Sequence, residues 1–293
     1  MSERDTWGGV AFGDVIQASH EAFVVMDDAG LVLAWNEAAE RMFGYDAGAA
    51  VGARLSELII PERYRDLHER GLRRYLETGV GPVLGTTIEI EGVDRDGRAV
   101  PVELTINATS HDGGARFHAF LNDITDRRRT ERFLRADARL GWTCADRGSP
   151  LRPEDVLAAI GEEMMFEVGL AWLADPGGRL RLAGQWTPSD AAVAFSVESA
   201  EFSFERGEGI PGQVWERGEP SWQRDVSEEP GYVRRANAQR LGLRCGLFVP
   251  VGRGSACRGV LELLTSEWQP ADRDLLERFA RLGDRLGSYV ASR

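Results

Sequence analysis

The sequence predicts an α+β fold in two domains, each built on a central antiparallel sheet flanked by helices. The chain has 293 residues, enough for two domains that each bury a core of their own. In both halves, short apolar runs typical of strands alternate with amphipathic stretches that favour helices. Short turns rich in Gly and Asp join neighbouring apolar runs, which favours hairpins and therefore antiparallel pairing.

The composition narrows the classes of protein to consider. A net charge of -12 and a pI of about 5.0 argue against nucleic acid as a partner, because phosphate binding needs a concentrated basic face. The sequence has no apolar run of membrane-spanning length and no signal-peptide pattern, so we expect a cytoplasmic protein without a membrane partner. Three irregularly spaced cysteines and four scattered histidines predict neither a disulfide framework nor a metal site.

The first domain is expected over residues 14–125, after an N-terminal tail of residues 1–13. It opens with a hairpin, in which apolar runs flank the turn Asp27–Gly30. Asn36 can then cap a helix that Gly44 ends. The remaining elements are a long amphipathic helix and a three-strand meander, near residues 62–78, 84–94, 99–109 and 116–123.

This order of elements and several short motifs resemble a PAS domain. The matching stretches are a D-x-x-G hairpin, the run WNEAAERMFGY, a Val-Gly turn, the block RDGRAVPVEL and a closing Asp-Ile-Thr, at residues 27–30, 35–45, 51–52, 95–104 and 123–125. The resemblance implies a five-stranded antiparallel sheet with helices on one face. In many members of the family a small molecule is held between the sheet and the helices.

The long helix around His68 is similar to that of the haem-binding, oxygen-sensing PAS domains of the FixL type. The resemblance places His68 at their proximal iron ligand, and a neutral imidazole beside an apolar pocket is what ferrous haem requires. The candidate pocket-lining residues come from this helix and from the strands: Tyr64, Leu72, Val83, Leu104 and Ile106.

Two interpretations of His68 stay open. One is a haem-based gas sensor for oxygen or redox state, although Ile88 stands where those sensors have a distal arginine. The other, which we favour, is a histidine half-buried on an amphipathic helix in a domain without a cofactor. A covalently bound flavin is not expected, because the light-sensing members need a cysteine and none precedes Cys144.

We expect residues 126–140 to form a helical linker between the two domains. The segment is rich in arginine and in strong helix formers and contains no Gly or Pro. It follows Asp123, Ile124 and Thr125, which we expect to relay conformational change from the first domain into the helix.

The second domain is expected over residues 141–293. It begins with a helix near Pro153, and its strands are expected in pairs: residues 170–174 with 180–186, and 243–251 with 259–265. Residues 207–212 match the dinucleotide motif G-x-G-x-x-G, but they follow a polar loop and neighbour antiparallel hairpins, so we do not expect a nucleotide loop.

Four stretches of this half resemble a GAF domain: ERGEGIPGQVWERGEPSWQRDV, GLRCGLFVPV, GVLELLTSE and the closing helix. The resemblance implies an antiparallel sheet flanked by helices, with a ligand pocket in some members and no catalysis by the domain. Haem ligated by histidine is not expected because this half has no His, and covalent bilin is not expected because Cys245 lies inside an apolar strand.

The closing helix, near residues 270–292, leaves two interpretations open. Leu275, Phe279, Leu282, Leu286 and Tyr289 recur at spacings of four and three, as in a short coiled-coil seam between the subunits of a homodimer. The same stripe can pack on the domain's own sheet, and both can hold at once because Leu276 and Val290 widen the stripe. Gly283 and Gly287 would weaken it as an isolated helix.

Together the two halves predict a sensory input module of bacterial signal transduction that relays change through its connecting helices in a dimer. The sequence offers no catalytic constellation of paired carboxylates, Ser-His-Asp or activated Cys. We therefore expect the output to come from another domain or partner, such as a histidine kinase or a diguanylate cyclase.

Overall fold

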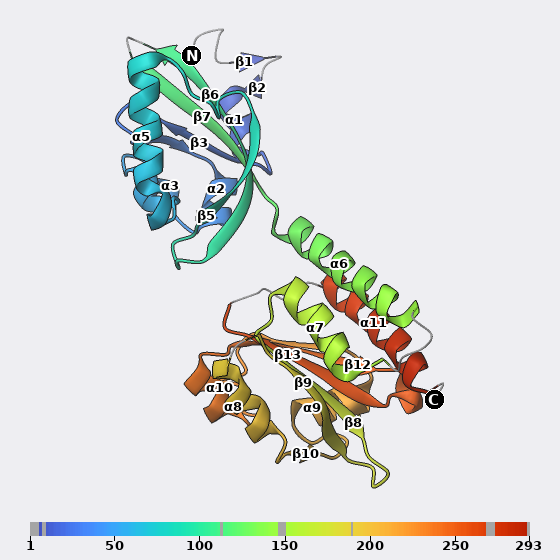
Figure 1. Cartoon of the computed structure of the whole chain (residues 1–293). Helices are drawn as coiled ribbons and strands as arrows, with labels where there is room; N and C mark the ends of the chain where they lie inside the picture. Colours follow the sequence, from blue (N-terminus) through green and yellow to red (C-terminus); the bar gives the residue numbers. More distant parts are fainter. Residues whose placement is uncertain are drawn as a thin grey trace. The chain divides into compact units, whose positions relative to one another are not determined.

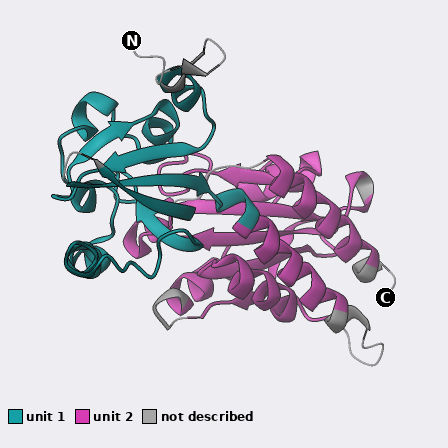
Figure 2. Cartoon of the chain, turned by 90° about the horizontal axis from the view of Figure 1, so that it is seen from above, with its two compact units in different colours: residues 1–127 teal, residues 128–293 magenta. Residues whose placement is uncertain are grey.

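The computed structural model describes residues 6–7, 10–111, 114–145, 151–188, 190–267 and 273–291 (Figure 1). The chain divides into two compact units, residues 1–127 and 128–293 (Figure 2). Each unit has a central antiparallel sheet with flanking helices, so the α+β fold class that the sequence predicts is confirmed.

Unit 1 holds a five-stranded antiparallel sheet in the order β4-β3-β7-β6-β5. The strands are β3 (Ala22–Met26), β4 (Val32–Trp35), β5 (Thr87–Val93), β6 (Ala99–His111) and β7 (Gly114–Asp123). The helices are α1 (Phe12–Gln17), α2 (Glu37–Phe43), α3 (Ala47–Ala50), α4 (Leu55–Leu58) and α5 (Glu62–Thr78). Two short strands, β1 (Thr6–Trp7) and β2 (Val10–Ala11), pair within the stretch expected to be a tail.

The turns and caps of unit 1 follow from local chemistry. Asp27 Oδ1 accepts hydrogen bonds from the backbone N–H groups of Ala29 and Leu31, and Gly30 supplies the positive φ of 79° that closes the hairpin. Asn36 Oδ1 accepts from the backbone N–H of Ala39 at 3.0 Å, and Gly44 ends α2 in the left-handed region. The predicted cap and stop are both confirmed.

Unit 2 holds a six-stranded antiparallel sheet in the order β10-β9-β8-β13-β12-β11. The strands are β8 (Val168–Ala174), β9 (Leu180–Trp186), β10 (Ser203–Phe204), β11 (Ser221–Gln223), β12 (Cys245–Val251) and β13 (Gly259–Thr265). The helices are α6 (Thr125–Ala145), α7 (Pro153–Met164), α8 (Asp190–Ser199), α9 (Gly209–Arg217), α10 (Arg235–Leu241) and α11 (Arg273–Ala291), with α6 starting just before the division.

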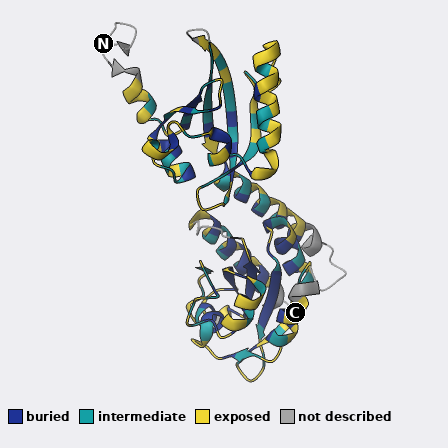
Figure 3. Cartoon of the chain, turned by 90° about the vertical axis from the view of Figure 1, so that its left-hand side faces the viewer, coloured by how far each residue is buried: buried dark blue, intermediate teal, exposed yellow. Residues whose placement is uncertain are grey.

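Helices cover both faces of this sheet and form two separate cores. One core joins α6, α7 and α11 to the sheet, and the other joins α8, α9 and α10 to the opposite face. Every residue of β12 and β13 is buried as a result (Figure 3). Within the described residues, no helix combines the length and apolar character needed to cross a membrane.

The motif G-x-G-x-x-G has a structural origin at each glycine. Gly207 and Gly209 adopt positive φ values of 79° and 59°, which residues with a Cβ rarely adopt. A Cβ on Gly212 would lie 2.2 Å from the carbonyl oxygen of Glu205. The motif therefore shapes the start of α9 beside an antiparallel sheet.

Candidate functional site: a sheet exit, a helix pair and a buried histidine

The three residues expected to relay a signal lie where β7 passes into α6. Asp123 Oδ1 accepts a hydrogen bond of 2.8 Å from the backbone N–H of Thr125, which stabilises the first turn of α6. The backbone N–H of Ile124 donates to the carbonyl oxygen of Pro101 in β6 at 3.0 Å, and its side chain is buried. The start of the helix is thus tied to the adjacent strand of the sheet.

Arg127 adds a second tie between the helix start and the sheet. Its Nη2 donates to Glu89 Oε1 at 2.8 Å and to Glu103 Oε1 at 3.0 Å. These carboxylates belong to β5 and β6, so one guanidinium joins two strands to α6. All three side chains are partly exposed, and such ion pairs each contribute only about 0–1 kcal/mol.

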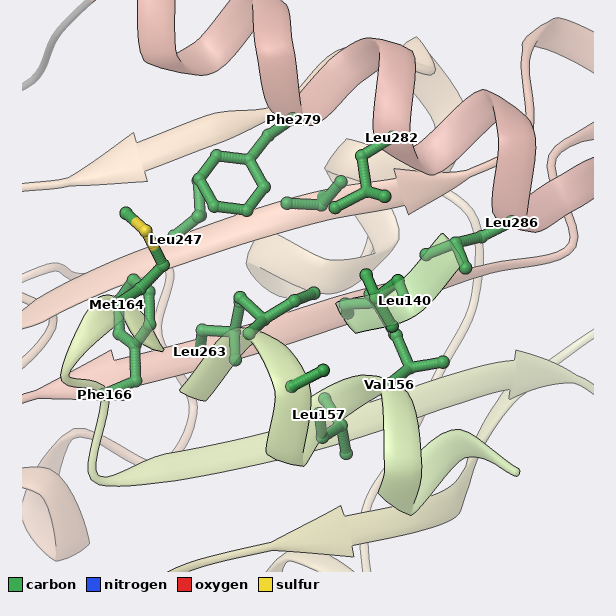
Figure 4. Packing of buried hydrophobic residues seen from close by; sticks show 14 of the residues in the cluster. Leu140, Val156, Leu157, Met164, Phe166, Leu247, Leu263, Phe279, Leu282 and Leu286 are labelled. Carbon is green, nitrogen blue, oxygen red and sulfur yellow. The ribbon is translucent and has the colours of Figure 1, made fainter. Parts of the chain in front are cut away.

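The rest of α6 is built into the core of unit 2. Phe133, Ala136 and Leu140 are buried, and the Phe133 ring packs edge-on against the Phe279 ring of α11 with centroids 5.1 Å apart. Leu140 lies in the same core as Leu286 (Figure 4). Since Arg129 is also buried, the buried positions of α6 recur at spacings of four and three along the helix.

The apolar stripe of α11 packs against its own unit. Leu275, Phe279, Leu282 and Leu286 are all buried in the core beside α6, α7 and the sheet. Of the two interpretations of this stripe, the structure shows packing on the domain itself, and these four side chains are not free to form a seam. The side chain of Tyr289 lies outside the described residues.

The glycines of α11 have a role that sequence reasoning missed. A Cβ on Gly283 would lie 2.1 Å from the carbonyl oxygen of Pro250, and one on Gly287 would lie 2.4 Å from Gly252 Cα. The backbone N–H of Gly252 donates to the carbonyl oxygen of Gly283 at 2.9 Å. The helix therefore touches the end of β12 backbone to backbone, and the four-residue spacing of the two glycines was the available signal.

An open groove of about 490 Å³ runs between α6 and α11 and is here named the helix-pair groove. It is lined by Phe133, Leu134, Asp137, Arg278, Arg281, Leu282, Asp284 and Arg285. Leu134 is 51% exposed within it, and Arg285 forms an ion pair with Asp137 across it. The groove thus combines an exposed apolar side chain with charges of both signs.

His68 lies on α5 with one ring nitrogen turned to the interior. Its Nδ1 is buried and has no hydrogen-bond partner among the described residues. Burial lowers the pKa of His68 below its ordinary value of 6.5, and the nearby carboxylate of Glu69 offsets this only in part. The imidazole is therefore held in its neutral form near neutral pH.

The candidate pocket-lining residues divide into two groups. Leu72 and Leu104 are buried in the core of unit 1 and Ile106 packs against it, whereas Tyr64 and Val83 are 44% and 39% exposed.

The space beside α5 is filled by the chain's own side chains. The Tyr75 ring packs edge-on against the Phe117 ring at 5.1 Å, and Leu72 belongs to the same core. These contacts pack the later turns of α5 against the sheet. Among the described residues, no group of three potential ligands could hold a metal ion.

Comparison with known proteins finds two family models that match consecutive parts of the chain. The PAS fold matches residues 13–124, and the GAF domain matches residues 154–284. Among curated relatives, the sensor protein FixL of Bradyrhizobium diazoefficiens is 28% identical over 186 residues, which cover 64% of this chain and 36% of that protein.

Two other relatives match only the equivalent of one domain. An uncharacterized protein of Azorhizobium caulinodans is 37% identical over 120 residues, or 41% of this chain and 16% of that protein. The cell-division control histidine kinase PdhS of Brucella abortus is 31% identical over 120 residues, or 41% of this chain and 11% of the kinase. The chain thus spans about a third or less of the length of the curated relatives it matches.

Solved structures of single domains are also similar to parts of this chain. The GAF domain of a phosphoenolpyruvate-protein phosphotransferase from Coxiella burnetii has a TM-score of 0.45 and 17% identity, covering 55% of this chain and 95% of that one. A PAS domain from Colwellia psychrerythraea has a TM-score of 0.33 and 23% identity, covering 39% of this chain and 94% of that one.

Both resemblances that the motifs indicate are confirmed: the chain is a PAS domain of FixL-like sequence followed by a GAF domain, two domains of regulatory and sensory proteins.

Proposed function

We propose that this chain is a sensory input module that receives a signal in its PAS or GAF domain and passes it on through connecting helices. The observation that carries the proposal is the course of α6. A single residue, Ile124, separates the last strand of the PAS sheet from the start of this helix, and later turns of the helix are buried in the GAF core. A rigid helix shared in this way can transmit a rotation or a shift between two folded domains.

The proposed relay works as a two-state arrangement. A change in the PAS sheet would alter the bond from Ile124 to Pro101 and the pairing of Arg127 with Glu89 and Glu103. The helix would then change its packing through Phe133 against Phe279 of α11. A ligand shifts such an equilibrium only by the difference in its affinity for the two states.

We propose that the output is supplied by a histidine kinase, as a further domain or as a partner, with a diguanylate cyclase as the alternative. A relationship to FixL and to the histidine kinase PdhS supports the kinase. In this scheme the chain regulates and does not itself catalyse. Its own contribution is the helix pair, in which α11 is held to the end of β12 by the hydrogen bond from Gly252 to Gly283.

The test is a change of helical phase in α6. Inserting one residue after Arg129 rotates the downstream part of the helix by about 100°, whereas inserting seven residues rotates it by only about 20°. With a kinase domain fused after Arg293, we expect the single insertion to change basal phosphorylation and the seven-residue insertion to keep it near the parent value. Equal kinase activity in all three proteins would rule out transmission through α6.

We also propose that the module acts as a homodimer in which the helix-pair groove of one copy receives the same groove of a second copy. A two-fold pair presents the same patch twice, so a useful patch must be self-complementary. The groove meets this requirement in charge, because acidic and basic side chains lie along it around the exposed side chain of Leu134. Its two aspartates are already paired within the chain, Asp137 with Arg285 and Asp284 with Arg253, so a second copy would share or exchange these pairs.

A second candidate function, a haem-based gas sensor, rests on His68. Its buried Nδ1 without a partner and its neutral ring favour a ligand role. Bound haem would supply an iron atom that takes up a diatomic gas, and His68 would hold it from α5. A Soret absorbance band in the purified protein that disappears in His68→Ala would support this function, and a colourless protein after incubation with haem would end it.

A further inference from the structure

A fully buried ion pair lies inside the GAF domain, on the sheet face covered by α8, α9 and α10. Glu262 of β13 and Arg234, at the start of α10, both have side chains with 0% exposure. The Glu262 carboxylate accepts hydrogen bonds from Arg234 Nη2 at 2.6 and 2.8 Å. It also accepts from Trp172 Nε1 at 2.8 Å and from the Tyr232 hydroxyl at 2.7 Å.

Four aromatic rings surround the guanidinium of Arg234. Its central carbon lies 4.9 to 5.8 Å from the ring centroids of Tyr232, Trp172, Phe195 and Phe204. Aromatic faces attract cations within about 6 Å, and a group of such faces beside a carboxylate is a recognition site for an organic cation. We name these four rings, together with Glu262, the cation cage.

Electrostatics keep the guanidinium charged and the phenol neutral. Burial alone would lower the pKa of Arg234, but the Glu262 carboxylate more than offsets it, so the pKa is raised. Burial, together with Glu262, raises the pKa of Tyr232 well above its ordinary value, so the hydroxyl remains a donor.

A buried ion pair is expensive to desolvate and is seldom more stabilising than apolar side chains of the same volume. Stability alone is therefore a weak reason for this arrangement.

The hydrogen bonding of Arg234 is also incomplete. Its Nη1 donates to Ser199 Oγ at 3.1 Å, but its Nε has no partner among the described residues. The hydroxyl of Ser196, buried three positions earlier on α8, likewise has none. Two buried polar groups left unpaired on this side of the domain indicate a site that the arginine does not fully satisfy.

We infer that the cation cage is a binding site for an organic cation of the guanidinium or ammonium class, and that Arg234 is its built-in occupant. The ligand would pair with Glu262 between the aromatic rings and could engage Ser196. Because Arg234 directly precedes α10, a ligand that takes the place of its guanidinium would displace the start of α10. This inference concerns the GAF interior and stands whether or not α6 is the relay.

The first test replaces the occupant. In Arg234→Ala, methylguanidinium is expected to raise the midpoint of thermal unfolding in a saturable way. Methylurea, which has a similar shape but no charge, should not do so, and neither ligand should act on the double variant Arg234→Ala with Glu262→Gln. The matched control is Arg240→Ala, which removes a partly exposed arginine of α10 that pairs with Glu198.

The second test uses the unaltered chain and therefore does not depend on the folding of a variant. Methylguanidinium is expected to speed backbone hydrogen exchange at residues 232–241 more than methylurea does at the same concentration. If the two compounds have equal effects on Arg234→Ala, the cage does not recognise cations and the inference fails. If Arg234→Ala does not fold, equal exchange in the two compounds overturns it instead.

Discussion

At the scale of single residues, Asn36 joins three segments of the PAS domain. Beyond its cap on α2, its Oδ1 accepts from the backbone N–H of Phe23 at 2.9 Å, and its Nδ2 donates to the carbonyl oxygens of Ile16 and Glu21. The side chain is 1% exposed, so removing it leaves buried backbone groups without partners.

We therefore expect Asn36→Ala to lower the free energy of unfolding of the PAS domain by about 2–4 kcal/mol, measured by urea denaturation. The matched control is Asp46→Ala. Asp46 precedes α3 at the same type of position but makes no side-chain capping bond, so its loss should change the free energy of unfolding by less than about 0.5 kcal/mol. Equal losses in the two variants would show that the Asn36 network contributes nothing.

His68 makes the stability of the PAS domain depend on pH. Its pKa is lowered on folding, so below pH 6.5 the unfolded chain binds a proton that the folded chain resists. Stability is thus full above pH 6.5 and falls as the pH drops from there toward the folded-state pKa. The fall in thermal midpoint over this range is expected to be smaller in His68→Gln than in the parent. An identical fall in both proteins would contradict the prediction.

At the scale of elements, the contact between α11 and β12 depends on the absence of a side chain. Gly283→Ala would place a methyl group against the carbonyl oxygen of Pro250 and is expected to destabilise the GAF domain by about 1–3 kcal/mol. Gly141→Ala on α6 is the control, because that glycine is exposed and nothing lies within 4 Å of its Cβ position. It should be neutral or stabilise by up to about 1 kcal/mol. Thermal unfolding of both variants provides the comparison.

Sequence reasoning located the elements that local chemistry determines. The helix near residues 62–78 and the strands near 180–186 and 259–265 were placed correctly, because glycine turns and regular apolar spacing bound them. It did not find α8, whose inner side chain Phe195 is buried while Val193 and Val197 on other faces are exposed. A helix that is apolar all round has no 3.6-residue signal.

The buried ion pair could not be read from the sequence for a different reason. Arg234 and Glu262 are 28 residues apart, and nothing in either local pattern distinguishes them from charges on a solvated surface. Only the tertiary fold brings α10 over β13. The relay residues Asp123–Thr125 were placed by family resemblance, whereas the burial of Phe133 and Leu140 against α11 required the structure.

At the scale of the whole molecule, the proposed dimer makes a prediction about association. Leu134→Arg adds a charge at the centre of the helix-pair groove and is expected to weaken dimerisation at least about tenfold, or about 1.4 kcal/mol, in sedimentation equilibrium. Leu67→Arg serves as the control, because Leu67 is 61% exposed on α5 and distant in sequence from the groove. A monomeric parent protein, or equal weakening by the two variants, would refute the groove as the interface.

The strand β13 contributes side chains to the cores on both faces of the GAF sheet. Successive side chains of a strand point to opposite faces, so Glu262 lies in the cation cage while its neighbours Leu261 and Leu263 lie in the core that holds α6 and α11. The two regions are separated by the thickness of one strand. A displacement of Glu262 would therefore act on the same strand that carries Leu261 and Leu263 into the core beside α6 and α11.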